Sequence, residues 1–276
     1  MDYLNEFFRN IIVLDTETTG VEDDSEIIEY SASFPESAND SFEDVANFTE
    51  RYNALNGIPP ESSAVHFICE SDLVDKPYYK DAYKEFYEFF DYKQYYVGHN
   101  VEFDRRMLRC NNLRVQDELV PAFEDDSKWI CTLKLAKKLY AEDPEFKNLT
   151  LSFLWFKFKL NEECTHKIEP HSAKDDVFMC YKVLNRLVQE CIKRGAIDPD
   201  KEIGSQLVEY SNEPILYKVM PFGKYKNKPL LSDEIPINYL LWFKDNSDLM
   251  NPESPAYDVG VEYSILNAIL ERKDQL

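Results

Sequence analysis

The sequence predicts an α/β fold in which a mixed central sheet is flanked by helices and followed by a small C-terminal extension. Two observations favour this class. First, three stretches read as successive strands, at residues 10–15, 26–34 and about 42–50, and the first two are rich in Ile and Val. Second, strand-like and helix-like stretches alternate from residue 61 onward. Successive strands followed by such alternation are typical of a mixed sheet covered by helices.

The elements after residue 60 follow from hydrophobic spacing and from turn residues. Helical spacing dominates residues 61–90, most clearly in the aromatic-rich stretch YKDAYKEFYEFF. The sequence then predicts a short strand at 95–98, a helix at 101–112, a strand at 128–132, a helix at 133–141 and a long amphipathic helix at 173–194.

The polar, turn-rich residues 195–204 are the best candidate for a domain boundary. We expect a main domain at 1–195, a connecting segment at 196–212 and a small C-terminal module at 213–276. The last of these is too short for a second large core.

Composition and charge restrict the class of protein. The chain of 276 residues is 44% hydrophobic, which is ordinary for a globular protein. Its 31 Lys and Arg residues against 52 Asp and Glu residues give a net charge of −21. This balance argues against a protein that coats long nucleic acid through a basic surface, although a nuclease can obtain affinity from metal ions and a local patch.

The cysteines and the apolar runs bear on the compartment. The six cysteines form no C-x-x-C pair, so we expect reduced thiols and a cytoplasmic protein. The N-terminal residues do not have the pattern of a signal peptide. No apolar run is long enough for a membrane span, so we expect no membrane partner.

Two carboxylates, Asp15 and Glu17, end the apolar run IIVLDTETTG at 11–20. Side chains alternate along a strand, so both project to the same side. Two neighbouring carboxylates repel each other, and either one is protonated or a cation lies between them. An isolated pair of this kind is weak evidence for a metal site, because two solvent-exposed acids at the end of a strand would give the same sequence pattern.

Two further acids change this balance. Asp104 follows His99 by five residues, and Asp176 follows His171 by the same interval, each in the opening turns of a predicted helix. Taken singly, either acid is explained by favourable charge near a helix N-terminus, and the histidine by a loop position. Taken together, four acids and a histidine at the edges of predicted elements favour a site for Mg²⁺ or Mn²⁺, which prefer hard oxygen ligands.

Three motifs, in order, are D-x-E-T-T-G, H-N-x-x-F-D and H-x-x-x-x-D. Their combination resembles the DEDDh family of 3′→5′ exonucleases, which have the RNase H-like exonuclease fold. The resemblance extends through AVHFICESDLVDKP and covers about residues 10–190. The tail MPFGKYKNKPLLSDEIPINYLLWF is similar to the small C-terminal extension that some members carry.

The resemblance implies a two-metal-ion hydrolysis that releases nucleoside 5′-monophosphates from DNA 3′ ends, single-stranded or duplex. Asp15 would bridge two Mg²⁺ ions, with Mn²⁺ as a substitute. Glu17 and Asp176 would complete the ligands of the first ion, and Asp104 would hold the second. His171 would take the proton from the attacking water, as suits an imidazole pKa near neutrality.

The same resemblance implies a set of residues that grip the terminal nucleotide. They are Thr18, Thr19, Gly20, Val21, His66 and Asn100. Plainer interpretations stay open: a simple turn for Gly20, an ordinary turn hydrophobe for Val21, and a helix cap for Asn100. Asp175 neighbours Asp176 on the predicted helix but is turned about 100° from it, so we expect it to face solvent.

Positive charge is scarce and clustered. Arginines gather at 105–109, lysines gather at 134–138, and lysines alternate with aromatics in YKVMPFGKYKNKPL at 217–230. The last stretch is a candidate DNA contact, with aromatics that fill the core of a small module as the alternative. GKYKNK lacks the spacing of a P-loop, so we expect no nucleotide triphosphate. Cys164, His166 and His171 do not form an ordinary zinc set.

The function that the sequence favours is therefore a free-standing exodeoxyribonuclease in DNA repair or degradation. Alternatives on the same fold are an RNA-trimming exonuclease, a proofreading subunit of a polymerase and a non-catalytic nucleic-acid-binding protein. The sequence contains no clear reader of the 2′-hydroxyl, so the choice of sugar rests on the resemblance.

Overall fold

The computed structural model describes residues 2–87, 93–115, 120–168, 172–254 and 256–273. The chain divides into two compact units. The first contains residues 1–136 and 148–211, and the second contains residues 137–147 and 212–276. The second unit is therefore built from two separate stretches of sequence.

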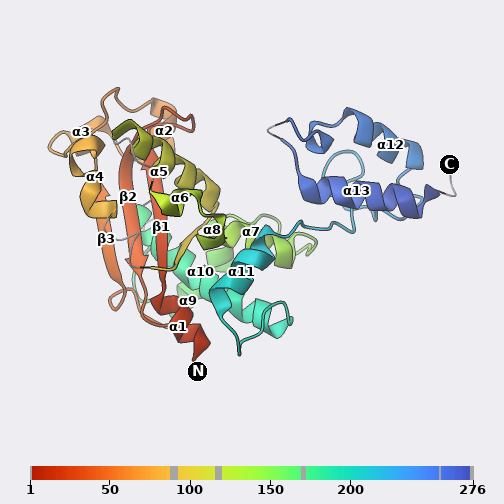
Figure 1. The fold of residues 1–276 in the computed structure, drawn as a ribbon, viewed down its shortest axis with the longest axis horizontal. Coiled ribbons are helices and arrows are strands. Elements are labelled where there is room, and N and C mark those ends of the chain that lie inside the picture. Colours follow the sequence, from red (N-terminus) through yellow and green to blue (C-terminus); the bar gives the residue numbers. More distant parts are fainter. Residues whose placement is uncertain (1, 88–92, 116–119, 169–171, 255, 274–276) are drawn as a thin grey trace. The chain divides into compact units, whose positions relative to one another are not determined.

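A five-stranded mixed sheet forms the centre of the first unit (Figure 1). Its strands are β1 (Ile11–Thr18), β2 (Ile27–Phe34), β3 (Ala46–Arg51), β4 (Tyr95–Gly98) and β5 (Trp129–Cys131), in the order β3-β2-β1-β4-β5. The first three pair antiparallel, whereas β4 and β5 run parallel to β1. The helices that flank this sheet complete the predicted fold class, which is confirmed.

Eleven α-helical segments and one short 3₁₀ turn of the described residues accompany the sheet. They are α1 (Tyr3–Arg9), α2 (Pro60–His66), α3 (Glu70–Leu73), α4 (Tyr79–Tyr87), α5 (Val101–Val115), α6 (Pro121–Glu124), η1 (Asp126–Lys128), α7 (Thr132–Tyr140), α8 (Leu151–Lys157), α9 (Leu160–Glu163), α10 (Ala173–Lys193) and α11 (Ile203–Asn212). The helix α7 begins in the first unit and ends in the second.

Five of these helices have no counterpart among the predicted elements: α1, α6, α8, α9 and α11. The apolar stretch at 151–160 contains α8 and the start of α9, which meet at Lys159 in the left-handed conformation (φ 59°). The helix α11 occupies part of the predicted connecting segment 196–212, and all of it except its last residue, Asn212, belongs to the first unit.

The two faces of β1 carry different side chains. Ile12 and Leu14 pack in one buried cluster with Met107 and Leu108 of α5. Residues 15 and 17 lie on the other side-chain face, because side chains alternate along a strand. The long helix α10 packs against β1 and β2, and it brings its first turn to that second face. The acidic end of β1 is thus half-buried rather than fully exposed to solvent.

The second unit has its own small core. It comprises α12 (Ile237–Asn246), η2 (Asp248–Met250) and α13 (Val259–Glu271), with an isolated antiparallel bridge between Val219 and Pro229. Its buried residues include Met220, Leu240 and Ile265. Tyr217, Phe222 and Tyr225 are packed against this core. The aromatics of the lysine-rich stretch therefore fill the module, as in the plainer of the two interpretations.

No helix of the residues described above combines the length and the apolar character needed to cross a membrane. All six cysteines are free thiols, and three of them (Cys131, Cys180 and Cys191) are buried.

Candidate metal centre

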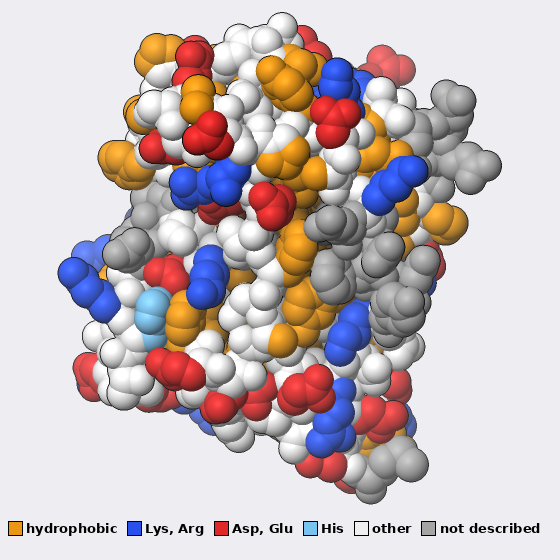
Figure 2. Space-filling model, turned by 90° about the vertical axis from the view of Figure 1, so that its left-hand side faces the viewer, with side chains coloured by type: hydrophobic (Ala, Val, Ile, Leu, Met, Phe, Trp, Pro, Cys, Tyr) orange, Lys and Arg blue, Asp and Glu red, His pale blue; other side chains and the backbone are white. Residues whose placement is uncertain are grey.

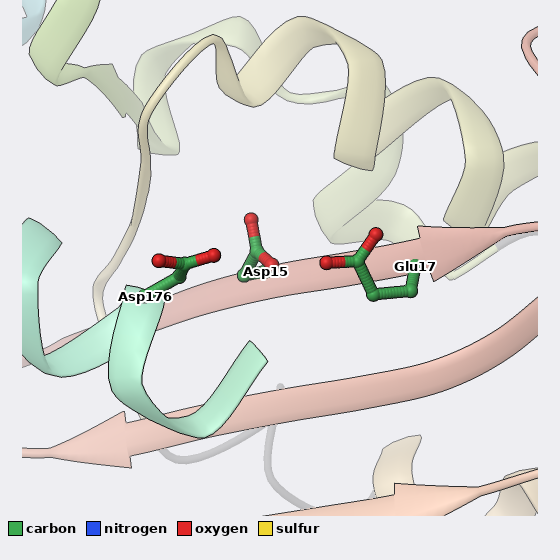
Figure 3. A group of neighbouring side chains, drawn as sticks. All are labelled: Asp15, Glu17 and Asp176. Atoms are coloured by element: carbon green, nitrogen blue, oxygen red, sulfur yellow. The ribbon is translucent and has the colours of Figure 1, made fainter. Parts of the chain in front are cut away.

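Three carboxyl groups from two elements converge in the first unit. Asp15 and Glu17 come from β1, and Asp176 comes from the first turn of α10. One oxygen of each lies within 4.8 Å of the others. Figure 3 shows the three carboxyl groups facing a common space between the strand and the helix. The structure thus brings together three of the four acids that the sequence selects as metal ligands.

Asp104, the fourth acid, is buried in the first turn of α5 and is fixed to β1. Its Oδ1 accepts hydrogen bonds from the backbone N–H of Thr16 (2.9 Å) and from the Thr16 hydroxyl (2.8 Å). The paired register of β1 with β4 ends at Val13, so the Thr16 N–H lies beyond that ladder. The Asp104 carboxylate supplies the acceptor that a longer β4 would have supplied.

Burial and mutual repulsion raise the pKa values of the acids. Burial is the largest cause for all four, and it raises the pKa of Glu17 to about 8 and the pKa values of Asp104 and Asp176 to about 7. The pKa of Asp15 rises well above its ordinary value, through burial and then through the charges of Asp104, Glu17 and Asp176. For Asp104, the Thr16 hydrogen bonds oppose the effect of burial on its pKa.

These shifts test whether the residues fit a metal ion. Carboxylates that cannot all ionise at neutral pH in a closed group need a compensating positive charge. The donor set consists of hard carboxylate oxygens, which suits a divalent cation such as Mg²⁺ or Mn²⁺ and does not suit a thiolate-preferring metal. The acidic cluster is therefore compatible with divalent-metal binding.

Glu29 is a fifth carboxylate beside this site, it is buried, and the sequence does not single it out. It lies on β2 directly opposite Glu17, and only 2% of its surface is exposed. Its carboxylate accepts hydrogen bonds from Arg51 Nε and from the backbone N–H of Ala173 (3.1 Å). A charged residue inside the apolar strand IIEYSASF was the signal that could have found it.

His171 lies outside the described residues, but residues on both sides of it along the chain are placed. Asp175 is buried, and its Oδ1 lies 3.0 Å from Nε2 of His166. The His166 ring stacks on Phe42 with ring centroids 3.5 Å apart. The expectation that Asp175 faces solvent is therefore wrong. The Asp175 side chain is instead turned toward His166.

Thr18, Thr19, Gly20 and Val21 form the end of β1 and the turn that follows. The Thr18 hydroxyl donates to the carbonyl of Gly20 (2.6 Å), and the Thr19 N–H donates to the carbonyl of Glu26 (2.9 Å). A Cβ at Gly20 would lie 2.9 Å from Oγ of Ser25, so the turn has a packing reason for glycine. The side chain of Val21 is 65% exposed beside this turn.

His66 and Asn100 lie in different segments. His66 ends α2 and is buried, and its Nδ1 accepts a hydrogen bond from the N–H of Ile68 (3.1 Å). Burial lowers the pKa of His66, which favours the neutral ring. The helix α2 is joined to the turn by a hydrogen bond from the Ser62 hydroxyl to the carbonyl of Thr19 (2.8 Å). Asn100 is exposed before α5, in the left-handed conformation (φ 70°).

The arginines of α5 do not form a free basic patch. Arg105 pairs with Asp126, Arg106 with Asp23 and Arg109 with Glu124. Figure 2 shows one face of the surface, on which basic and acidic side chains intermingle. The acidic stretches near residues 23 and 124–126 thus neutralise the cluster that the sequence predicts.

Comparison with known proteins adds to this geometry. A family model described as "Exonuclease" (RNase T) matches residues 12–184. Exodeoxyribonuclease 10 of Escherichia coli K12 is 30% identical over 198 residues, which cover 71% of this chain and 76% of that protein. The chain belongs to the DEDDh 3′→5′ exonuclease family. Its catalytic unit is thus that of a hydrolase that cleaves phosphodiester bonds.

Further relatives agree with membership of the DEDDh family. The DNA polymerase III subunit epsilon of Buchnera aphidicola is 31% identical over 182 residues, which cover 63% of this chain and 72% of that subunit. A solved structure of exonuclease X in complex with 5′ overhanging duplex DNA superposes with a TM-score of 0.52 at 24% identity, over 73% of this chain and 99% of that one. It shows that the exonuclease fold is shared.

A second family model matches part of the C-terminal unit. It is described as "Putative quorum-sensing-regulated virulence factor" and matches residues 212–252. The exonuclease model ends before this stretch, so the two matches fall on different parts of the chain.

Proposed function

We propose that this DEDDh exonuclease removes nucleotides from DNA 3′ ends with the help of Mg²⁺ or Mn²⁺. The observation that carries the proposal is the convergence of Asp15, Glu17 and Asp176 within 4.8 Å in a half-buried setting that raises their pKa values. DNA as the substrate is supported by the names of two relatives, exodeoxyribonuclease 10 and an exonuclease X structure with duplex DNA.

The four acids divide into two proposed sets of ligands. Asp15, Glu17 and Asp176 would hold one Mg²⁺ ion, and Asp15 with Asp104 would hold a second, with Mn²⁺ as a substitute for either. When bound, such ions stabilise the negative charge on the attacking and leaving oxygens at phosphorus. Oδ1 of Asp104 is engaged by Thr16, which leaves its other oxygen, Oδ2, for a metal.

Proton transfer is assigned to His171. It would take a proton from the attacking water as the new bond to phosphorus forms and the bond to the 3′ oxygen breaks. The leaving 3′ oxygen takes up a proton from solvent, so the products are a nucleoside 5′-monophosphate and a strand one nucleotide shorter with a free 3′-hydroxyl. The next residue, Ser172, precedes α10, and its carbonyl accepts the N–H groups of Asp175 and Asp176 (both 2.9 Å). His171 precedes Asp176 by only five positions in the sequence.

The terminal nucleotide is assigned to the turn after β1. Thr18, Thr19 and Gly20 would offer backbone and hydroxyl groups, and the exposed Val21 would contact the last base. Arg106 donates to the carbonyl of Val21 (2.8 Å), which fixes the turn. The remaining proposed contacts of the substrate are His66 and Asn100.

The test uses a 5′-labelled single-stranded DNA with Mg²⁺ or EDTA. Wild type is compared with Asp15→Asn, and Asp75→Asn, an exposed acid outside the cluster, is the matched control. We expect a ladder that shortens from the 3′ end, that requires metal and Asp15, and that Asp75→Asn leaves unchanged. An RNA oligonucleotide of the same sequence, assayed alongside, shows whether the enzyme prefers deoxyribose or ribose. Folded wild-type protein that cleaves neither strand would overturn the proposal, and faster cleavage of RNA would replace the substrate.

A further inference from the structure

A row of charged residues crosses three strands beside the acidic cluster. The register places Glu17 on β1 opposite Glu29 on β2, and Glu29 opposite Arg51 on β3. Residues directly opposite each other share a face of the sheet, so all three side chains lie on the face that α10 covers. Arg51 is partly exposed (39% of its side chain), whereas the Glu29 side chain is 3% exposed.

Glu29 uses both carboxylate oxygens within the protein. Oε2 accepts from Arg51 Nε, and Oε1 accepts from the N–H of Ala173, the first residue of α10. The side chain of Ser172, which holds the N-cap position, makes no capping hydrogen bond. Since the first N–H groups of a helix have no partner inside the helix, a carboxylate from a neighbouring strand takes the place of the cap.

The position of Ala173 matters for the candidate metal centre. Asp176 lies three residues further along, in the same helical turn. The hydrogen bond that Glu29 accepts from the Ala173 N–H therefore fixes this turn, which carries Asp176, to β2. The strand β2 lies next to β1, which carries Glu17 and Asp15. Each Glu29 oxygen already accepts a hydrogen bond from the protein, and Glu29 is not part of the converging group of acids.

We propose that Glu29 is a positioning residue for the metal centre: it holds the first turn of α10 against β2, and Arg51 neutralises its charge. The inference rests on the proposed metal-dependent function of the Asp15, Glu17 and Asp176 cluster. It separates two roles that acids play here. The three converging acids attract cations, whereas Glu29 is balanced by Arg51 and orients Asp176.

The two roles of Glu29 can be separated by substitution. Glu29→Gln keeps an oxygen that can accept from Ala173 but removes the charge, whereas Glu29→Met removes the acceptor at similar volume. Arg51→Met leaves the Glu29 carboxylate buried without its partner, which is costly. The same Arg51→Met change in a Glu29→Gln background leaves no such charge, so its effect there should be small.

The experiment measures the Mn²⁺ dissociation constant of the metal-free protein by calorimetry, together with kcat and KM on a 5′-labelled DNA strand. We expect Glu29→Met to weaken Mn²⁺ binding by about tenfold or more, as for other groups that orient metal ligands. Glu29→Gln should stay within about threefold of wild type, because it keeps the hydrogen bond. The loss should appear in kcat more than in KM. Glu50→Met, on the opposite face of β3, is the matched control and should leave both measurements unchanged.

Two outcomes would overturn the proposal: Glu29→Met binding Mn²⁺ as wild type does, or Glu29→Gln failing as badly as Glu29→Met. If thermal melts in EDTA show that Glu29→Met is unfolded, the test uses Arg51→Met in two backgrounds instead, wild type and Glu29→Gln. Equal losses of Mn²⁺ affinity in the Glu29 and Gln backgrounds would then refute the role of Arg51 as its counter-charge, and with it the proposal. Asp176→Asn identifies a different failure: if it leaves Mn²⁺ binding intact, the metal centre itself is wrong.

Discussion

Asp104 and Thr16 are joined by two hydrogen bonds to a single carboxylate oxygen, one from the backbone and one from the hydroxyl. This pairing fastens α5 to β1 at the point where the ladder with β4 has ended. It also opposes the rise that burial causes in the pKa of Asp104.

Thr16→Val removes the hydroxyl at nearly constant shape and leaves the backbone bond in place. We expect a loss of about 1 kcal/mol in the free energy of unfolding, the usual size for one hydrogen bond. Because a bond that lowers the pKa of Asp104 is lost, that pKa should rise, and the acidic limb of the pH–rate profile should move to higher pH. Urea melts and kcat/KM profiles check both effects. Thr49→Val, which removes a hydroxyl bonded to Ser31, is the control, and an identical profile in the two variants would contradict the expectation.

Metal-free protein should lose stability as the pH rises. The folded pKa values of Glu17 (about 8) and Asp176 (about 7) lie above their unfolded values of about 4. Groups with raised pKa values stabilise the fold fully below the unfolded value, and that stability disappears as the pH passes through 7–8. In EDTA we expect Tm to fall by about 5 °C or more between pH 6 and pH 8.

Excess Mn²⁺ should flatten this dependence, because bound cations favour the ionised carboxylates. Glu17→Gln should raise Tm in EDTA at pH 8 while it abolishes cleavage. Differential scanning fluorimetry with and without metal gives both curves. A Tm in EDTA that rises with pH would show that the acids are not forced together as the structure indicates.

The contact between His166 and Asp175 brackets His171 along the chain. Asp175→Asn weakens this contact by removing a charge, and we expect kcat to fall by about tenfold as the ends of the segment are held less firmly. Mn²⁺ affinity should change much less, because Asp175 is not among the three converging acids. Single-turnover kinetics and calorimetry separate the two effects. A loss of Mn²⁺ affinity equal to that of Asp176→Asn would assign Asp175 to the metal centre instead.

The paired arginines of α5 offer a gain-of-affinity test. Neutralising their partners in the triple variant Asp23→Asn, Glu124→Gln and Asp126→Asn frees Arg105, Arg106 and Arg109 for phosphates. We expect tighter binding to single-stranded DNA, with a salt dependence steeper by up to about 2 in logarithmic slope for three contacts. Fluorescence anisotropy across a salt series measures this.

The control removes the same number of acids elsewhere, at the exposed residues Asp75, Asp200 and Glu253. An equal gain in affinity there would mean that net charge alone is responsible.

Wild-type cleavage should be distributive, since a protein with a net charge of −21 retains DNA poorly between turnovers. Removal of hundreds of nucleotides per encounter in a trap experiment would contradict this.

The C-terminal unit is the last candidate for DNA contact. Its aromatics fill their own core, but Lys224 and Lys226 are exposed on the same stretch. Replacing both with Ala should raise KM on DNA more than it lowers kcat, because exposed lysines act on phosphate binding and not on the chemistry. An unchanged KM would show that these lysines of the C-terminal unit do not contact DNA. Lys244→Ala together with Lys273→Ala, at other exposed lysines of this unit, is the control.

Much of the first unit could be predicted because its signals are local. The strands at 11–18 and 27–34 have the apolar runs of buried strands, and the placement of Asp104 and Asp176 follows from short motifs at helix starts. Alternation on one strand was enough to place Asp15 beside Glu17. The contact between that pair and Asp176 is consistent with the family motifs, although no spacing within the sequence would have shown it.

What could not be predicted depends on partners far apart in the chain. Glu29 is explained only by Arg51 and Ala173, which are 22 and 144 residues away. The burial of Asp175 depends on His166 folding back over α10, and a helical wheel cannot contain that information. Short helices such as α8 and α11 are stabilised by packing more than by their own sequence.

The division of the chain has a consequence for its engineering. The polypeptide passes from one unit to the other at residues 136–137, 147–148 and 211–212, and the helix α7 carries the first passage. Glu142, from the inserted stretch, accepts from the backbone N–H of Val219 (3.2 Å), so both stretches of the second unit share hydrogen bonds. Cutting after residue 211 would remove most of the second unit and leave the end of α7 and the stretch up to residue 147 without the segment they pack with. A shortened nuclease would therefore need a redesigned stretch at 137–147 as well as an earlier end.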